Sequence, residues 1–216
     1  MHPRGTTFVW LFAYGFAAFS LRYLLPQPPF NTALLSARHP VLLPVHVGTA
    51  AVALATGPLQ FIAAVRARRP QLHRWLGRTY VAAVLISGSA GLGLSPSMPD
   101  PVLRYVFGSL AATWLLVTAI AWGAALRRDF TAHRRWMIRS YSVTFAAITV
   151  RLAVPLIFIP MGGAHVMANP FSPSGVSVLS DASRLPFMTW PLNLVFAEWL
   201  IRRRHAPLAK AASSSV

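Results

Sequence analysis

Long apolar runs alternate with short arginine-rich stretches along the chain, and this alternation predicts an all-α membrane protein. A bilayer core about 30 Å thick is crossed by about 20 apolar residues in a helix. Six apolar segments approach that length, so we expect one membrane domain with six transmembrane helices. Their predicted ranges are about 6–25, 42–65, 79–96, 104–126, 137–160 and 186–201.

The first apolar run and the C-terminal tail depart from the regular pattern of spans. Arg4 precedes the first run, and Ala18 and Ser20 are small residues typical of a cleavage site, so the run could be a signal peptide. The apolar run continues to Leu25, which favours a retained span. At the other end of the chain, we expect residues 205–216 to form a disordered tail.

Charged residues are scarce and mostly positive. The 216 residues are 55% hydrophobic and 11% charged, with 20 Lys and Arg against four acids. A soluble protein with this many basic residues would be expected to bind nucleic acid. Here the basic residues lie between apolar runs, so we expect no nucleic-acid partner. Residues 66–78 and 127–139 each hold five arginines. Because positive loops stay in the cytoplasm, we expect both regions and both termini on the cytoplasmic side of a bacterial inner membrane.

Two similar sequences open the third and fifth predicted spans, "HRWLGRTY" from His73 and "HRRWMIRSY" from His133. The units around them, at about 45–95 and 105–155, predict two parallel-repeat helical hairpins, which form the core in spans two to five. The expected pseudo-symmetry places His73 and His133 opposite each other near the cytoplasmic interface.

This repeated motif has three interpretations. It could serve topology alone, with arginines holding the loop inside and Trp and Tyr forming an interfacial belt. Its arginines could instead bind a lipid headgroup or a phosphorylated small molecule. In the third interpretation, His73 and His133 ligate the iron of a b-type haem, because His is the usual axial ligand and helix bundles hold such cofactors. The sequence leaves these alternatives open, and the cofactor is unknown.

Polar residues within the spans predict an internal polar seam, because intramembrane polar groups usually face the bundle interior. At about 100° per residue, His46, Thr49, Thr56 and Gln60 share one face of the second span. Arg151 lies deep in the fifth span, with no acid at its depth. The candidate ligand-binding residues are His46, Thr49, Thr56, Gln60, Arg74, Arg78, Tyr80, Arg134, Arg139, Tyr141, Arg151 and Glu198.

Two local contacts are also expected. Glu198 lies near the inner end of the sixth span, where an ion pair with Arg139 or Arg135 is the simplest arrangement. Gly57 and Pro58 should kink or shorten the second span, because proline cannot donate a backbone hydrogen bond. The sequence has no Cys, no nucleotide-binding loop, and no Ser-His-Asp or paired-carboxylate constellation in its spans.

Several stretches together resemble a group of small bacterial membrane proteins known as domain of unknown function 2306. These stretches are "HVGTAAVALATGPLQF", "HRWLGRTY", "RRDFTAHRRWMIRSY" and "NLVFAEW". The resemblance covers about residues 40–200 and implies an integral membrane protein, but it implies no chemistry. From the polar seam and the repeated motif, we expect a protein that binds or passes a small polar or anionic molecule, or a lipid, through the seam. A membrane electron carrier with haem or quinone and a non-catalytic accessory subunit are the alternatives.

Overall fold

The computed structural model describes residues 3–24, 33–98, 101–158 and 190–203, and all regular secondary structure in these ranges is helical. Helices labelled α are α-helices and those labelled η are 3-10 helices. In chain order they are α1 (Pro3–Ser20), η1 (Leu21–Leu24), α2 (Ala33–Arg38), α3 (Leu42–Thr56), η2 (Pro58–Phe61), α4 (Ala63–Arg68), α5 (Pro70–Leu94), η3 (Ser95–Ser97), α6 (Pro101–Leu126), α7 (Phe130–Phe158) and a last helix over 190–203.

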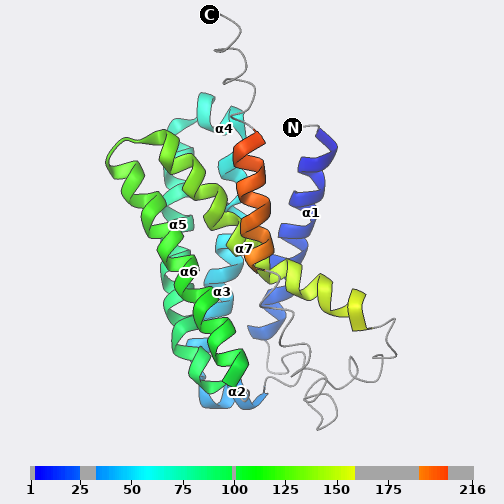
Figure 1. Cartoon of the computed structure of the whole chain (residues 1–216). Helices are drawn as coiled ribbons and strands as arrows, with labels where there is room; N and C mark the ends of the chain where they lie inside the picture. Colours follow the sequence, from blue (N-terminus) through cyan, green and yellow to red (C-terminus); the bar gives the residue numbers. More distant parts are fainter. Residues whose placement is uncertain (1–2, 25–32, 99–100, 159–189, 204–216) are drawn as a thin grey trace, which may run out of the picture.

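The central bundle consists of α3, α5, α6 and α7, with α1 packed against α3. The start of α1, α4, the turn between α6 and α7 and the end of helix 190–203 lie at one end of the bundle (Figure 1). The helix α2 and the start of α6 lie at the other end. The two arginine-rich regions, 66–78 and 127–139, are therefore at the same end, which we call the basic end.

The helix α3 stops at Thr56, well before the expected limit at residue 65, because Pro58 offers no N–H to continue the ladder. The chain then makes the short turn η2. It becomes α-helical again in α4, and α5 begins at Pro70, a residue suited to the first helical position. The segment 66–78, which we expected to be a loop, is thus mostly helical.

The turn between α6 and α7 is fixed by hydrogen bonds at both helix ends. Arg128 has a positive φ of 61°, and its N–H donates to the Ala125 carbonyl at 3.0 Å. Asp129 donates from its N–H to the Ala124 carbonyl at 3.0 Å, which completes a Schellman-type end. The Asp129 carboxylate then accepts the Ala132 N–H at 2.9 Å and caps the start of α7.

Three helical segments among the described residues are long and apolar enough to cross a bilayer: Leu42–Phe61, Pro70–Ser97 and Pro101–Leu126. A shorter apolar helix covers Trp10–Ser20. The all-helical membrane class is confirmed, whereas the six spans and the hairpin repeat stay predictions. The expected loop at 161–186 and the tail at 205–216 lie outside the described residues.

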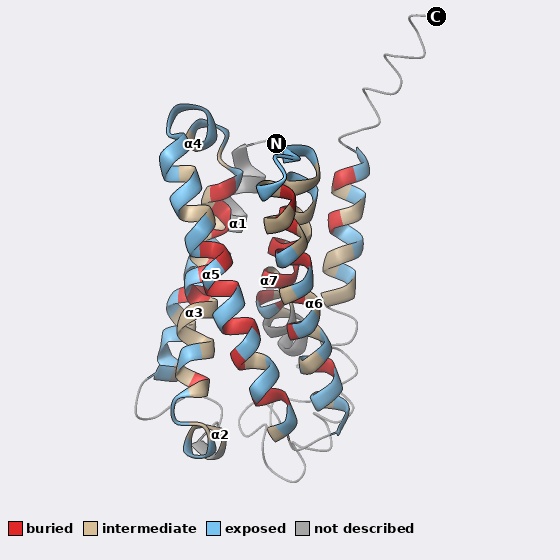
Figure 2. Ribbon diagram, turned by 90° about the vertical axis from the view of Figure 1, so that its left-hand side faces the viewer, coloured by how far each residue is buried: buried red, intermediate tan, exposed pale blue. Residues whose placement is uncertain are grey.

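Buried side chains line the inward faces of the bundle, and the outward faces are exposed (Figure 2). The main cluster joins α3, α5, α6 and α7, and a second one joins α1, α3 and α7. Many exposed side chains are large and apolar, including Leu116 at 61% and Val195 at 65% exposure. An exposed apolar surface of this extent is typical of a protein that lies in lipid.

Candidate functional site

A buried network of hydrogen bonds connects α5, α6 and α7. The Tyr80 hydroxyl lies 2.8 Å from both Ser140 Oγ and Thr144 Oγ1. The Trp114 indole N–H donates to Thr144 Oγ1 at 2.9 Å, and Thr118 Oγ1 lies 2.6 Å from Ser140 Oγ. Tyr80, Ser140 and Thr118 have no exposed surface. These polar groups satisfy one another, so the network holds three helices together and needs no ligand to do so.

Of these five residues, the sequence selected only Tyr80 as a candidate for binding. Thr118 and Trp114 were missed because a single hydroxyl or indole in an apolar span is common and carries no motif. Tyr80 and Ser140 are separated by the same 60 positions as His73 and His133. The motif nevertheless aligns Tyr80 with Tyr141, so a better signal was the spacing of Ser140 and Thr144, which are four residues apart and share one helical face.

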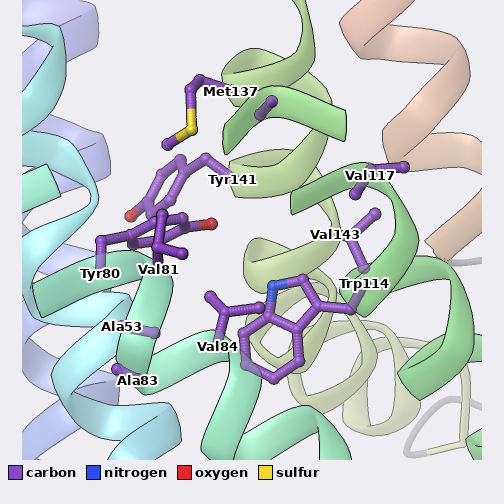
Figure 3. Packing of buried hydrophobic residues seen from close by; sticks show 11 residues of the cluster. Ala53, Tyr80, Val81, Ala83, Val84, Trp114, Val117, Met137, Tyr141 and Val143 are labelled. Atoms are coloured by element: carbon purple, nitrogen blue, oxygen red, sulfur yellow. The ribbon is translucent and has the colours of Figure 1, made fainter. Parts of the chain in front are cut away.

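The kink at Pro58 is covered by Tyr141. The Leu54 carbonyl would normally accept the N–H of residue 58, which proline lacks. The Tyr141 hydroxyl donates to that carbonyl over a long 3.4 Å, and its ring packs against Phe61 and Tyr80. Figure 3 shows the Tyr80 and Tyr141 rings side by side in the core. This close packing requires Gly57, because a Cβ there would lie 2.2 Å from the Tyr141 ring.

The buried side chain of Gln60 joins the η2 turn to α5. With its amide nitrogen toward His73, that nitrogen donates to His73 Nδ1 at 3.0 Å and to the His73 carbonyl at 3.3 Å. The amide oxygen then accepts the Gly77 N–H at 3.1 Å. A Cβ on Gly77 would lie only 3.3 Å from the Gln60 amide, so glycine permits this approach. The motif residues Gln60, His73 and Gly77 therefore form one structural contact.

The histidine of the second motif copy is held differently. His133 Nδ1 lies 2.9 Å from the Ala121 carbonyl and must donate its proton to it. The expected placement of His73 opposite His133 stays a prediction, as does the hairpin repeat from which it follows.

Haem ligation by both histidines would depend on which ring nitrogen of each imidazole is unprotonated. A ligating imidazole offers an unprotonated ring nitrogen to the metal. In His133 that nitrogen is Nε2, which fits. In His73, Nδ1 accepts from Gln60, so Nε2 carries the proton, which does not fit. Ligation by both imidazoles would require the Gln60 amide to turn over, so that its oxygen accepts from His73 Nδ1–H and gives up the bond from the Gly77 N–H.

The outer part of the predicted seam is also occupied by protein contacts. His46 Nδ1 donates to the Ser87 carbonyl at 2.9 Å, and Ser87 Oγ donates to the His46 carbonyl at 2.9 Å. Gly91 gives the imidazole room, because a Cβ there would lie 3.2 Å from it. Thr49 and Thr56 donate to carbonyls within α3, namely those of Val45 and Val52, at 2.6 and 2.8 Å.

Helix 190–203 is attached to α7 through two polar side chains. Asn193 Nδ2 donates to the Ser142 carbonyl at 3.2 Å and to Thr149 Oγ1 at 3.0 Å. Glu198 Oε1 accepts from Arg139 Nε at 2.6 Å, so the expected ion pair with Arg139 is present. The Arg139 guanidinium also lies 4.4 Å from the centre of the Trp136 ring. Arg139 is thus engaged in structural contacts rather than open to a ligand.

The remaining candidate arginines differ in position. Arg74, Arg78 and Arg134 are exposed at the basic end, and Arg78 lies 5.5 Å from the centre of the Trp75 ring. Arg74 lines a surface hollow of about 420 Å³ together with Arg68, Arg69, Pro70, Gln71 and Leu72. Arg151 is in α7, but its side chain lies outside the described residues.

The structure therefore separates the predicted candidates into two groups. His46, Gln60, Tyr80, Tyr141 and both motif histidines occupy contacts inside the bundle or between its helices. Arg74, Arg78 and Arg134 surround the basic end. Among the described residues, no group of three or more His, Cys, Asp or Glu side chains could hold a metal ion. The hollow around Arg74 is not lined by His73 or His133.

Helices that expose apolar faces, with polar side chains turned inward, define a helical membrane protein. The sequence model of the family described as "Predicted membrane protein (DUF2306)" matches residues 43–177. The chain belongs to this family. The match contains both copies of the His-Arg motif, Gly57, Gln60 and the buried network. No curated protein and no solved structure matches the chain.

Proposed function

We propose that this is a multi-pass protein of a bacterial inner membrane that binds an anionic group at its basic end. The ligand is a phosphate, either on a lipid headgroup or on a phosphorylated small molecule. The apolar outward faces support the membrane location, and the arginines of the basic end support a cytoplasmic orientation for that end and for both termini. Arginines bind phosphate strongly and in a defined geometry through paired N–H donors.

The hollow at the start of α5 is the observation that carries this proposal. Three arginines, Arg68, Arg69 and Arg74, line one concave surface of about 420 Å³. Arg69, at the N-cap position, makes no side-chain capping bond, and the first turn of α5 contains no acid. The first backbone N–H groups of a helix lack intrahelical partners and carry partial positive charge. A bound anion would satisfy them and offset the repulsion among the guanidiniums.

The acids of the described residues do not neutralise this hollow. Asp129 caps α7, and Glu198 pairs with Arg139. Because the interior polar groups are bonded to one another, the proposal places the ligand at the basic end rather than along a path through the seam.

Ligand-dependent thermal stabilisation tests the proposal. The unfolding temperature of the detergent-purified protein would be measured with inorganic phosphate and, separately, with phosphatidylglycerol. We expect stabilisation of a few degrees when the ligand is well above its Kd. Stabilisation by phosphate alone would identify a soluble phosphorylated ligand, and stabilisation by the lipid alone would identify a headgroup.

A matched pair of variants separates a site from general charge. The triple variant Arg68→Gln, Arg69→Gln, Arg74→Gln should lose the stabilisation. The triple variant Arg127→Gln, Arg128→Gln, Arg135→Gln removes the same charge at the same end and should keep it. Equal loss in both variants, or no stabilisation of the unaltered protein by either ligand, would contradict the proposal.

A further inference from the structure

Helix 190–203 presents a second concave surface near the basic end, with a different chemistry. A hollow of about 370 Å³ is lined by Val195, Glu198, Trp199 and Arg202. It combines an apolar side chain, an indole, a carboxylate and a guanidinium within two turns of one helix. Its volume is in the range of small-ligand pockets.

This hollow lies on the side of the helix that faces away from the protein. Ala197 and Ile201 are buried against the bundle at 0% and 6% exposure. The opposite stripe is exposed, and its apolar members are Leu192, Val195, Phe196 and Trp199. In a bilayer, acyl chains cover such a stripe, and tryptophan marks the level of the headgroups. The hollow therefore lies where the chains and the headgroup of a lipid meet.

Glu198 gives the hollow a negative charge, which is rare at the basic end. Its Oε1 accepts a hydrogen bond from Arg139. Its side chain is 39% exposed and also lines the hollow. The other acid among the described residues, Asp129, is used as the cap of α7. A carboxylate oxygen can accept more than one hydrogen bond. Glu198 can therefore pair with Arg139 and still receive a cationic donor from outside.

Arg202 supplies the opposite charge one turn nearer the end of the helix, about 6 Å along its axis. Its guanidinium is flexible enough to reach toward Glu198 along the helix surface. The hollow thus offers one acceptor for a cation and one donor group for an anion, beside an apolar stripe. That combination matches an amphiphile with both a phosphate and a primary ammonium.

We propose that this hollow binds the headgroup of a zwitterionic phospholipid with a primary amine, namely phosphatidylethanolamine. The ammonium donates to the Glu198 carboxylate, the phosphate accepts from Arg202, and an acyl chain follows Val195 and Leu192. A choline headgroup has no N–H to donate, and a glycerol headgroup has no cation, so both bind less tightly. This site is separate from the phosphate hollow at the start of α5.

Competition among three lipids tests the assignment. The full chain would be released from detergent micelles that contain equal amounts of phosphatidylethanolamine, phosphatidylcholine and phosphatidylglycerol, and the retained lipids would be counted by native mass spectrometry. We expect about a tenfold preference for the ethanolamine lipid over the choline lipid, the size expected of one charged hydrogen bond. Equal retention of these two lipids would overturn the proposal.

Four variants locate the preference. Glu198→Gln keeps the shape of the side chain and should abolish the preference, and Arg202→Gln should weaken retention of all three phospholipids. Arg139→Gln breaks the same ion pair from the other side but leaves the carboxylate, so the preference should persist. Arg127→Gln, at the turn between α6 and α7 and outside the lining, should also leave it unchanged. A preference that survives Glu198→Gln, or one lost equally in Arg139→Gln, would contradict the site.

Discussion

The buried polar side chains between α5, α6 and α7 and the arginines of the basic end differ in how their polar atoms are satisfied. Tyr80, Ser140 and Thr118 have no exposed surface, and each lies within hydrogen-bonding distance of another buried hydroxyl. Arg68, Arg69 and Arg74 are exposed and line an open hollow. The comparison indicates that polar residues in an apolar span need not mark a ligand path. Here they hold helices together, and the proposed anion site lies at the surface.

The largest effect is expected at Gly57, where the interior is tightest. Gly57→Ala would place a Cβ 2.2 Å from the Tyr141 ring, so the ring or α3 must move. Overpacking typically costs about 1–3 kcal/mol, and we expect the upper end of that range here; the free energy of unfolding in detergent would measure it. Gly48→Ala is the matched control on the same helix, because nothing lies within 4 Å of its added Cβ. Similar stabilities for the two variants would show that the interior is looser than described.

The next effect is expected at the centre of the buried network. Tyr80→Phe removes a hydroxyl that contacts Ser140 and Thr144, each at 2.8 Å. Interhelical hydrogen bonds in membranes are worth about 0.6–1.7 kcal/mol each, so we expect a loss of about 1–3 kcal/mol. Tyr105→Phe is the control, because Tyr105 is 75% exposed. An unchanged free energy of unfolding for Tyr80→Phe would contradict a network that holds the helices together.

A smaller effect is expected at the ion pair that joins helix 190–203 to α7. The Arg139 and Glu198 side chains are 20% and 39% exposed, so water screens their attraction. Glu198→Gln should therefore lower the free energy of unfolding by about 1 kcal/mol or less. A loss as large as that of Gly57→Ala would mean that this pair, rather than the buried network, organises the bundle.

The smallest effect is expected at the threonines of α3. Thr49 and Thr56 donate to carbonyls one turn earlier in their own helix and connect no second element. Thr49→Ala and Thr56→Ala should change the free energy of unfolding by about 0.5 kcal/mol or less. A ligand that lost affinity in either variant would restore the seam as a binding path.

Much of the helical arrangement could be predicted from the sequence. The position of α6 and the break of α3 near Pro58 followed from local rules, and the ion pair of Glu198 was predicted with Arg139 as one of two candidate partners. The start of α5 at Pro70 could not, because arginines in the first turns of a helix and arginines in a loop give the same hydropathy. The long helical extension was therefore assigned to a loop.

The site was predictable only in part. Repeated motifs identified His73, His133 and both tyrosines, and all four lie in the first halves of α5 and α7, which begin at the basic end. Their roles depend on tertiary partners, since Gln60 holds His73 whereas a backbone carbonyl holds His133. Within the motifs, Gly77 permits the approach of Gln60, and the second copy has Ile138 at the corresponding position, directly before the second arginine that the two copies share. Spacing predicted proximity, and only the packed structure supplies the hydrogen-bond partners.

Reactivity of single cysteines in membrane vesicles tests the contrast between interior and basic end most directly, because the chain has no native cysteine. One variant carries Ser140→Cys in the buried network, and the other carries Arg74→Cys at the basic end. With a small membrane-impermeant thiol reagent, Arg74→Cys should react when the cytoplasmic face is exposed, while Ser140→Cys stays unmodified from either face. Modification of Ser140→Cys at a rate close to that of Arg74→Cys would reveal a water-filled path through the bundle and contradict the account.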